Sequence, residues 1–391
     1  MDPDFSLLND FLERTDADGY LIEANSENAD QRYMSGFDAP DPFITLYDGE
    51  DIHLLLPGME CRRADRESRA RTVTRNETYG VEGRIRIYGA ERNRGVLAGF
   101  LHAHGIESVA VPYWFPAATV EGLRKEGVTV RFDTEGVLLS MRARKRSDEI
   151  EFIRECQRAN EAAMATVERL LTEATVVENV LHLNGEVLTS ERVRTEIERE
   201  LLRHDCSHQH QEPVIACGSA AADPHDRGSG PLYAGETILV DIFPKNTASQ
   251  YFSDISRTFV KGEPHPKIKR WSELVVDAQQ AALDQIEPGV SAPSIHDAAC
   301  EVFEEAGFET KRTNPRTDVG FTHRTGHGLG LSIHEDPRIG PKGDTIQPGN
   351  VFTVEPGLYD PDVGGVRIED LVVVTEDGYE NLTEYPVELV L

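Results

Sequence analysis

The sequence predicts an α+β protein of two domains: a smaller α/β domain over residues 1–143 and a larger, strand-rich domain over residues 144–391. Three observations lead to this prediction. The chain of 391 residues exceeds what one hydrophobic core usually supports. Helix-like and strand-like segments alternate over about the first 140 residues. The basic run RARKR, residues 142–146, then marks a boundary, and strand-like runs dominate from Pro213 onward.

The first domain is assigned to the α/β class segment by segment. A helix-like run ends before Gly19, where a strand begins. Two apolar runs flank Asp48-Gly49-Glu50 and predict a β-hairpin, because such residues favour a tight reversal. Further strands are expected at RIRIYG, SVAVPYW and VTVRF, with helices at residues 96–104 and 118–126 between them. No glycine-rich phosphate loop follows these strands, so no nucleotide site is expected.

The second domain is expected to begin with a long helix. Ser147 is its predicted N-cap, and the acidic residues that follow suit the positive end of a helix dipole. A helical apolar stripe continues to about Leu171, and Thr189 or Ser190 opens a second helix. The RARKR run before Ser147 is interpreted as a solvated linker, not as a nucleic-acid patch. Later helices are expected at about 266–286 and 293–306.

The charge balance excludes several classes of partner. The chain has 40 basic and 69 acidic residues, a net charge of −29, and only eight of the basic residues are lysine. Such a surface repels nucleic acid and anionic membranes, so neither is expected as a partner. It resembles the surfaces of cytoplasmic proteins from salt-loving organisms, in which counterions screen the self-repulsion. Stability is therefore expected to rise with salt concentration.

Cysteine usage and hydropathy indicate a cytoplasmic protein. The five cysteines are scattered and include no CxxC pair, which fits a reducing compartment better than a disulfide framework. The start MDPDFSLLND lacks the basic and apolar regions of a signal peptide. No run approaches the ~18 apolar residues of a membrane helix.

Two strand pairs place acidic residues inside apolar runs. Asp241 lies in ILVDIF and Asp254 in FSDISRTF, and a hairpin symmetric about Thr247–Ala248 would make them face each other. Opposed like charges destabilise a sheet unless something neutralises them. Downstream, a hairpin centred on Asp362 places the glutamates of VFTVEPGLY and GGVRIED, Glu355 and Glu369, opposite each other. Asp254 alone could be a solvent-facing residue of an edge strand, but two such pairs indicate a cation.

His327, in Gly326-His327-Gly328, could add an imidazole to these carboxylates. A lone histidine is more often an ordinary core or surface residue, but four carboxylates in apolar runs change that balance. Their formal charge of −4 matches two divalent cations, and oxygen ligands with one nitrogen favour Mn²⁺, Co²⁺, Fe²⁺ or Zn²⁺. Two metals about 3.5–4 Å apart can activate a shared water and stabilise a tetrahedral intermediate, which is the chemistry of hydrolysis.

The motifs DIFP…FSDISRTF, GHGLGLSIHE, VFTVEPGLY and GGVRIED, in this order, resemble the pita-bread metallopeptidases of family M24, which include methionine aminopeptidase, Xaa-Pro aminopeptidase and prolidase. The resemblance covers Arg146–Leu391. ENADQRYMSGFDAPDPFI resembles the creatinase-like N-terminal domain of the Xaa-Pro branch. The resemblance implies a pita-bread catalytic domain with two divalent metal ions, expected to be Mn or Co, with Zn or Fe as alternatives. Their ligands would be Asp241, Asp254, His327, Glu355 and Glu369.

The resemblance also implies roles for residues around the metals. Glu355 would hold and deprotonate the bridging water and pass the proton to the leaving amine. His334 and His225 would act in catalysis and contact the substrate, His334 by stabilising the intermediate or orienting the scissile carbonyl. The connection from Asp241 to Asp254 is about two residues longer than the family pattern. Two other histidines, His208 and His210, lie in a polar run and are expected to be solvated, and His323 matches no motif.

Two arginines are candidate substrate-binding residues. Arg338 matches a position where prolidases are thought to hold the substrate's C-terminal carboxylate, but it could equally be a surface arginine after Pro337. Arg367 is on the same face of its strand as Glu369, so it could line the pocket or brace that ligand.

The most favoured function is hydrolysis of Xaa-Pro bonds in small peptides with proline in the second position. Arg338 and the short hairpin between Glu355 and Glu369 favour a dipeptidase (prolidase) over an Xaa-Pro aminopeptidase that acts on longer peptides. A creatinase-like amidinohydrolase and a catalytically silent binding relative are the remaining alternatives. Because the family usually dimerises, a homodimer is expected.

Overall fold

The computed structural model describes residues 3–79, 94–208 and 212–391. The chain divides into two compact units, Met1–Arg142 and Ala143–Leu391. None of the helices in the described part of the chain is long and apolar enough to cross a membrane.

The N-terminal unit is built on one mixed six-stranded sheet in the order β4-β3-β2-β1-β5-β6. β1 pairs antiparallel with β2 and parallel with β5, and β2 and β3 form the hairpin predicted around Asp48. The Asp48 carboxylate closes that turn by accepting hydrogen bonds from the N–H groups of Glu50 and Asp51. The strands are β1 (Gly19–Ala24), β2 (Phe43–Tyr47), β3 (Ile52–Leu56), β4 (Thr72–Arg75), β5 (Ser108–Pro112) and β6 (Thr129–Asp133).

Helices flank this sheet, as expected for an α/β unit. They are α1 (Ser6–Thr15), α2 (Ala29–Ser35), α3 (Cys61–Glu67), η1 (Asn76–Thr78), α4 (Arg94–Ala103), α5 (Ala117–Lys125) and α6 (Val137–Ala143). The strands predicted at SVAVPYW and VTVRF are β5 and β6, and the two predicted helices are α4 and α5, so these predictions are confirmed. The strand predicted at RIRIYG lies outside the described residues.

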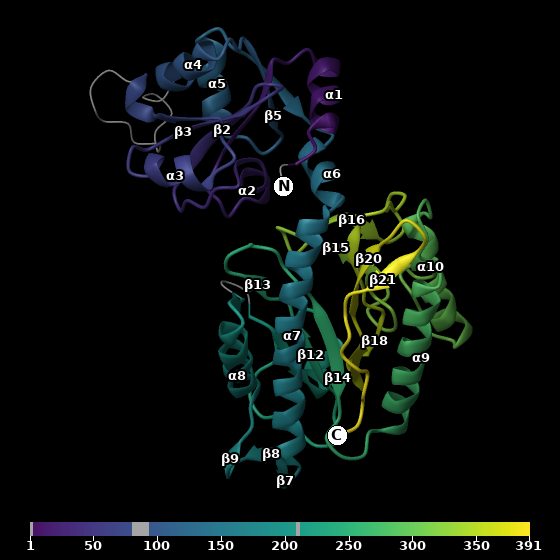
Figure 1. Ribbon diagram of the computed structural model, residues 1–391. Helices are drawn as coiled ribbons and strands as arrows, with labels where there is room; N and C mark the ends of the chain where they lie inside the picture. The colour runs from purple at the N-terminus through teal and green to yellow at the C-terminus, as the bar shows by residue number, and fades with distance from the viewer. Residues whose placement is uncertain (1–2, 80–93, 209–211) are drawn as a thin grey trace. The chain divides into compact units, whose positions relative to one another are not determined.

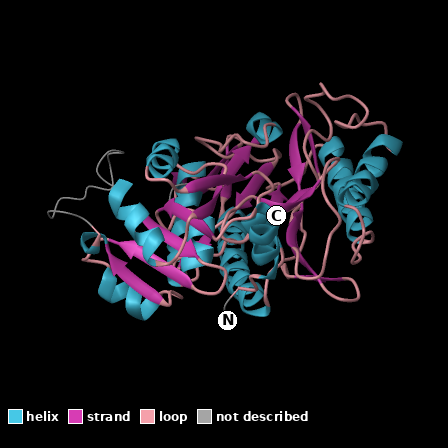
Figure 2. Cartoon of the chain, turned by 90° about the horizontal axis from the view of Figure 1, so that it is seen from above, coloured by secondary structure: helices cyan, strands magenta, loops and turns pink. Residues whose placement is uncertain are grey.

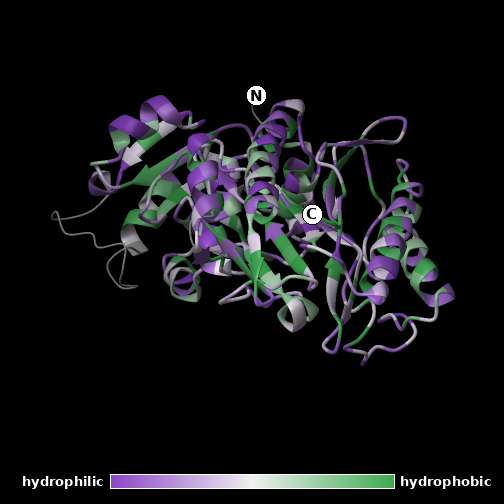
Figure 3. Ribbon diagram, turned by 90° about the horizontal axis from the view of Figure 1, so that it is seen from below, coloured by the Kyte–Doolittle hydropathy of each residue, from purple (hydrophilic) through white to green (hydrophobic). Residues whose placement is uncertain are grey.

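The second unit has strands in its middle and a helix pair on each side (Figures 1 and 2). One side carries α7 (Ser147–Glu173) and α8 (Ser190–Arg203), which share an apolar core with β12 (Ile238–Ile242) and β14 (Ile255–Phe259). The other side carries α9 (Pro266–Leu283) and α10 (Ala292–Glu305), which pack with the C-terminal strands. Figure 3 shows the strands between the helices as strongly hydrophobic, as expected for strands buried on both faces.

Two sheets meet in the middle of this unit. One has the order β11-β12-β14 and the other β16-β15-β17-β20-β21, with β18 and β19 forming a separate hairpin. A bridge between Ser256 and Glu369 joins them. The further strands and the 3-10 helix are β7 (Thr175–Val177), β8 (Val180–Leu183), β9 (Glu186–Val187), β10 (Cys206–Ser207), β11 (Val214–Cys217), η2 (Gly218–Ala222), β13 (Lys245–Asn246), β15 (Gly326–Gly328), β16 (Glu335–Ile339), β17 (Val351–Val354), β18 (Gly357–Asp360), β19 (Gly364–Arg367), β20 (Asp370–Val374) and β21 (Tyr379–Asn381).

The two acidic hairpins differ in how well their register was predicted. The β18–β19 and β17–β20 ladders pair Gly357 with Arg367 and Val354 with Asp370, so the hairpin is centred on Asp362 as predicted. In the first hairpin, Asp241 pairs with Ser256 and not with Asp254, so the predicted register is wrong. The turn has four residues, 247–250, because the Asn246 side chain accepts hydrogen bonds from Ala248 and Ser249 N–H.

The start of α7 also corrects the sequence prediction. Thr189 caps α8 as predicted, but α7 is capped by Arg146, whose N–H donates to Glu149, and not by Ser147. The RARKR run is not a solvated linker. The Lys145 side chain is 1% exposed and pairs with Glu335 at 3.2 Å, while Arg142 is buried and pairs with Asp30 at 3.0 Å. These partners are remote in sequence, so the run alone could not reveal its burial.

Candidate metal centre

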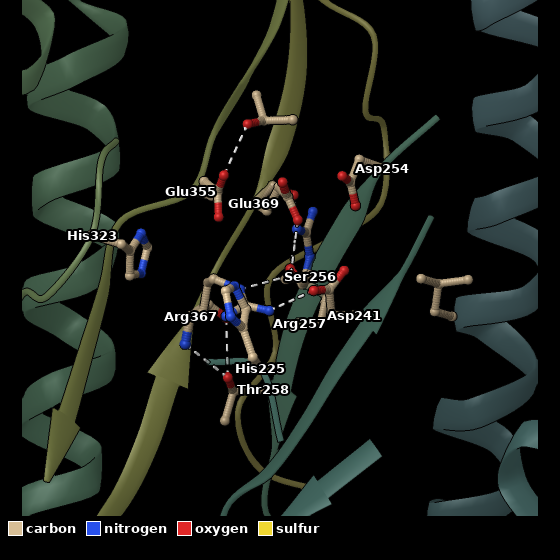
Figure 4. A network of polar contacts seen from close by, with 12 residues as sticks. His225, Asp241, Asp254, Ser256, Arg257, Thr258, His323, Glu355, Arg367 and Glu369 are labelled. Carbon is tan, nitrogen blue, oxygen red and sulfur yellow. Dashed lines mark hydrogen bonds and ion pairs between the residues drawn. The ribbon is translucent and has the colours of Figure 1, made fainter. Parts of the chain in front are cut away.

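Four carboxylates and one imidazole come together where the two sheets of the second unit meet. Asp241 is on β12, and Asp254 directly precedes β14. His327 is in the middle of β15, Glu355 directly follows β17, and Glu369 directly precedes β20. Figure 4 shows the two aspartates on the teal strands and the two glutamates on the olive ones.

The distances in this cluster fit a metal site. Ligand atoms of Asp254, His327 and Glu369 all lie within 4.8 Å of one another. Nε2 of His327 is 3.7 Å from Oδ2 of Asp254 and 3.5 Å from Oε1 of Glu355. A buried oxygen, Oδ1, of each aspartate has no hydrogen-bond partner among the described residues. Unpaired buried carboxylate oxygens are costly, so these residues fit a bound metal.

Backbone contacts fix the imidazole of His327. The backbone N–H of His327 donates to Thr353 Oγ1 at 3.1 Å, and ring Nδ1 donates to the carbonyl oxygen of Gly328 at 3.1 Å. Because that carbonyl can only accept, the proton is on Nδ1 and the lone pair is on Nε2, toward the carboxylates. Burial, followed by the charge of His334, lowers the pKa of His327 to about 3. The ring is therefore neutral, as a metal ligand must be.

Burial, followed by repulsion between neighbouring carboxylates, disfavours the ionised form of Asp254, Glu369 and Glu355 when no cation is bound. Burial, and then the charges of Glu369, Asp241 and Glu355, raise the pKa of Asp254 well above its usual value. Burial and the neighbouring carboxylates likewise raise the pKa of Glu369. The pKa of Glu355 rises to about 7, again chiefly through burial. Divalent cations would reverse these shifts.

Arg367 supplies the cluster with a permanent positive charge. It is 3% exposed, and Nη2 donates to Asp241 at 2.6 Å. Nε donates to Ser256 Oγ at 2.9 Å, and that hydroxyl donates to Glu369 at 2.8 Å. The sequence left two roles open for Arg367, lining the substrate pocket or bracing Glu369. These contacts favour the bracing role: Arg367 contacts Asp241 directly and Glu369 through Ser256.

Sequence reasoning missed His323 and Tyr359. The Tyr359 hydroxyl accepts from Nη1 of Arg367 at 3.2 Å and lies 2.8 Å from Nε2 of His323. Nδ1 of His323 donates to the carbonyl oxygen of Arg324, so Nε2 accepts the tyrosine proton. Burial, followed by the charge of Arg367, lowers the pKa of His323 to about 3. The available signal was a tyrosine in an apolar strand, because a buried phenol needs a partner.

The other histidines occupy different surroundings. The His334 ring is exposed and lies 4.3 Å from the His327 ring, between centroids. His225 is exposed on the loop after η2. Burial is the largest cause of the lowered pKa of His323 and of His334, and the charge of His225 is a smaller cause in the same direction. Figure 4 shows His225 on the Arg367 side of the cluster. His208 is buried against Glu198 at 3.0 Å, so the expectation that it is solvated is wrong, and His210 lies outside the described residues.

Arg338 lies directly opposite His327 in the β15–β16 ladder, but its side chain is 65% exposed. Its nearest acidic partner is Asp336, at 3.6 Å.

A group of buried and partly buried carboxylates around a neutral imidazole, with further histidines at its edge, defines the class of metal-dependent hydrolases. The comparison with protein families agrees. Metallopeptidase family M24 matches residues 151–376, more than half of the chain, and the chain therefore belongs to this family. As a member, it is a hydrolase that uses divalent metal ions.

Individual relatives extend the similarity to nearly the whole chain. An Xaa-Pro dipeptidase from Pyrococcus horikoshii is 28% identical over 97% of this chain and 97% of its own length. Among solved structures, a prolidase from Pyrococcus furiosus has a TM-score of 0.76 at 26% identity, covering 97% and 99% of the two chains. An X-Pro aminopeptidase from Thermotoga maritima has a TM-score of 0.78 at 25% identity, with the same coverage. These similarities confirm the predicted fold class, a pita-bread domain preceded by a smaller α/β domain.

Proposed function

We propose that this protein is an Xaa-Pro dipeptidase that removes the N-terminal residue of dipeptides ending in proline. The observation that carries the proposal is the cluster of four carboxylates around Nε2 of His327, of which Asp254 and Glu369 are buried and Asp241 and Glu355 partly buried. A chain with this cluster that aligns end to end with Xaa-Pro dipeptidases of similar length supports the same reaction class.

The five clustered residues would hold two divalent ions, and their oxygen-rich donor set favours Mn²⁺ or Co²⁺ over softer metals. When bound, the ions supply Lewis acidity toward a water molecule and the scissile carbonyl. Asp241, Asp254, His327 and Glu369 act as ligands in this proposal. Glu355 is both ligand and base.

Glu355 would carry the proton of this reaction. Its carboxylate would take a proton from the attacking water and pass it to the leaving amine, as a general base that later acts as a general acid must do. Thr353 Oγ1 holds its Oε1 at 3.2 Å, so the carboxylate has a fixed orientation. Exposed His334 and His225 would contact the scissile carbonyl and the tetrahedral intermediate from the edge of the cluster.

An Xaa-Pro aminopeptidase is the second candidate. It is favoured by one observation: the X-Pro aminopeptidase of Thermotoga maritima is as similar in structure as the prolidases. The two functions differ only in whether the substrate ends after proline.

A direct assay tests the proposal. Metal-depleted protein is loaded with Mn²⁺ or Co²⁺ at high salt and offered Xaa-Pro dipeptides, longer Xaa-Pro peptides and creatine. Proline release from dipeptides is the expected result. Absence of any proline-dependent cleavage with either metal would refute the proposal, and creatine hydrolysis would indicate an amidinohydrolase. Glu355→Ala is expected to abolish turnover and to lower the bound-metal content together.

The proposal includes a cytoplasmic homodimer. Sparse cysteines, four of them buried, and the acidic composition support the compartment. Light scattering in molar KCl would measure the mass of the assembly, and a monomer mass would contradict the dimer.

A further inference from the structure

A buried ion pair closes the loop that carries His334. The loop, residues 329–334, joins β15 to β16, and Gly328 and Glu335 are the paired residues on its two sides. Glu335 therefore directly follows His334 in the chain. Its side chain is 1% exposed, and its Oε1 lies 3.2 Å from Nζ of Lys145, whose side chain is also 1% exposed. The end of the loop is thus held by two opposite charges that are shielded from water.

The backbone around Lys145 is fixed against the segment that leads into β17. The N–H of Lys145 donates to the carbonyl oxygen of Gly349 at 2.7 Å, and the side chain of Asn350 donates to the carbonyl oxygen of Ala143 at 2.9 Å. Asn350 directly precedes β17, and Glu355 directly follows that strand. The ion pair therefore connects the loop to the strand that ends at the proposed general base.

Gly330 leaves the space in which the ion pair lies. A Cβ atom at Gly330 would lie 2.9 Å from Cε of Lys145, and closer still to Oε1 of Glu335, so a larger residue does not fit. The carbonyl oxygen of Gly330 accepts a hydrogen bond from the N–H of Phe252 at 2.8 Å, which fixes this part of the loop. Because the loop backbone packs directly on the ion pair, a change in the pair reaches the loop by contact.

The position of the His334 ring depends on this backbone. The ring is exposed and lies in T-shaped contact with the ring of His327, with the two centroids 4.3 Å apart. None of the residues that the structure describes forms a hydrogen bond with the His334 ring. The ring is therefore placed by the loop that carries it, and the loop ends at Glu335.

We propose that the Lys145–Glu335 ion pair positions His334 beside the metal cluster, so that both residues act on the reaction through the histidine. The inference rests on the proposed function, in which His334 contacts the scissile carbonyl. Separating two buried opposite charges leaves each without compensation, so the pair resists displacement of the loop. A displacement of about 1 Å at a reacting group can lower a rate by about 100-fold. Loss of the pair is therefore expected to lower kcat.

A set of variants separates positioning from stability. Lys145→Met, Glu335→Gln and the double variant Lys145→Met/Glu335→Leu are loaded with Mn²⁺ and assayed on Ala-Pro in molar KCl, with bound metal measured. The double variant removes both buried charges, so it should regain most of the stability that a single replacement loses. Arg154→Met is the matched control. It breaks another ion pair between α7 and a strand, at 2.7 Å from Glu380, on β21 at the opposite edge of the sheet from β16.

The two single variants and the double variant are each expected to lower kcat by about 10- to 100-fold, with KM and metal content within about two-fold of wild type. His334→Ala should lose about 100- to 1000-fold, as after removal of a group that stabilises the intermediate. Combined with His334→Ala, Lys145→Met should lower kcat no further, because the ring that the pair positions is gone. Arg154→Met should match wild type.

The position of the His334 ring can also be followed without turnover, by NMR of protein that contains isotope-labelled histidine and diamagnetic Zn²⁺. The His334 signal is identified by its absence in His334→Ala. Its chemical shift depends on the neighbouring His327 ring, so it should change in Lys145→Met and in the double variant. It should stay unchanged in Arg154→Met.

Wild-type kcat in the double variant would overturn the inference, because the pair would then contribute only to stability. Independent losses from Lys145→Met and His334→Ala, which multiply when combined, would overturn it as well, and so would an unchanged His334 signal in the double variant. If Lys145→Met does not fold, the double variant decides. A wild type that does not cleave Ala-Pro would refute the proposed function, and the His334 signal would still test the positioning.

Discussion

Removal of the metal should make the stability of this protein fall as the pH rises through neutrality. The perturbation acts on Glu355, whose pKa burial raises from 4.5 to about 7 when no cation is present. Between these two values the folded state binds more protons than the unfolded state, so the free energy of unfolding decreases with increasing pH. The stabilising contribution is fully present below pH 4.5 and is lost as the pH passes 7.

The size of the effect follows from the shift. At about 1.4 kcal/mol per pH unit, a rise from 4.5 to about 7 corresponds to about 3 kcal/mol from this one group. Asp254 and Glu369 have raised pKa values too, so they add to the loss in the same direction. The effect is large compared with a typical stability of about 5–15 kcal/mol.

Urea unfolding in molar KCl with a chelator, from pH 5 to pH 8.5, measures this dependence. Glu355→Gln keeps the shape of the side chain and removes its titration, so at pH 8.5 the metal-free variant should be more stable than metal-free wild type by about 3 kcal/mol. Glu376→Gln, at an exposed position, is the control and should change nothing. With saturating Mn²⁺ the order should reverse. Parallel pH profiles of metal-free wild type and Glu355→Gln would refute the reasoning.

Three further changes test the surroundings of the site. Tyr359→Phe removes the hydroxyl shared by Arg367 and His323. The variant should lose about 1–3 kcal/mol of stability and turn over more slowly at unchanged metal content. Metal loss would contradict a role of Tyr359 that is confined to holding Arg367 and His323. Lys145→Met removes the buried ammonium partner of Glu335. The free energy of unfolding, measured in urea, should fall by about 3–5 kcal/mol. A smaller loss would show that other contacts neutralise Glu335. The thermal midpoint should rise from dilute buffer to molar KCl, because salt screens the charge of −29, and an unchanged midpoint would contradict that explanation.

The clustered carboxylates could be recognised from the sequence because an ionised group in an apolar strand is costly without a partner. Asp241 in ILVDIF and Glu355 in VFTVEPGLY carry that signal by themselves. The second hairpin could also be placed in register, since its short turn leaves one centre, at Asp362. The first could not, because its turn depends on the side chain of Asn246 and on a positive φ of 68° at Gln250. Neither feature follows from hydropathy.

Contacts between remote segments set the limit of prediction for the rest of the site. Arg367 and its partner Asp241 are 126 positions apart, and no local pattern joins them. The same holds for Lys145 and Glu335, which are buried together although the first lies in a run of basic residues. Alternation along a strand predicts which face a side chain occupies, but not which remote segment covers that face.

The role of Arg367 changes the charge argument that first indicated two metals. Four carboxylates alone carry a formal charge of −4, which two divalent cations neutralise. Because Arg367 is held permanently against Asp241, the cluster carries −3, and two divalent cations leave one positive charge in excess. A site with excess positive charge inside a strongly acidic protein attracts an anion, so its electrostatics favour a substrate with a free carboxylate over a neutral one.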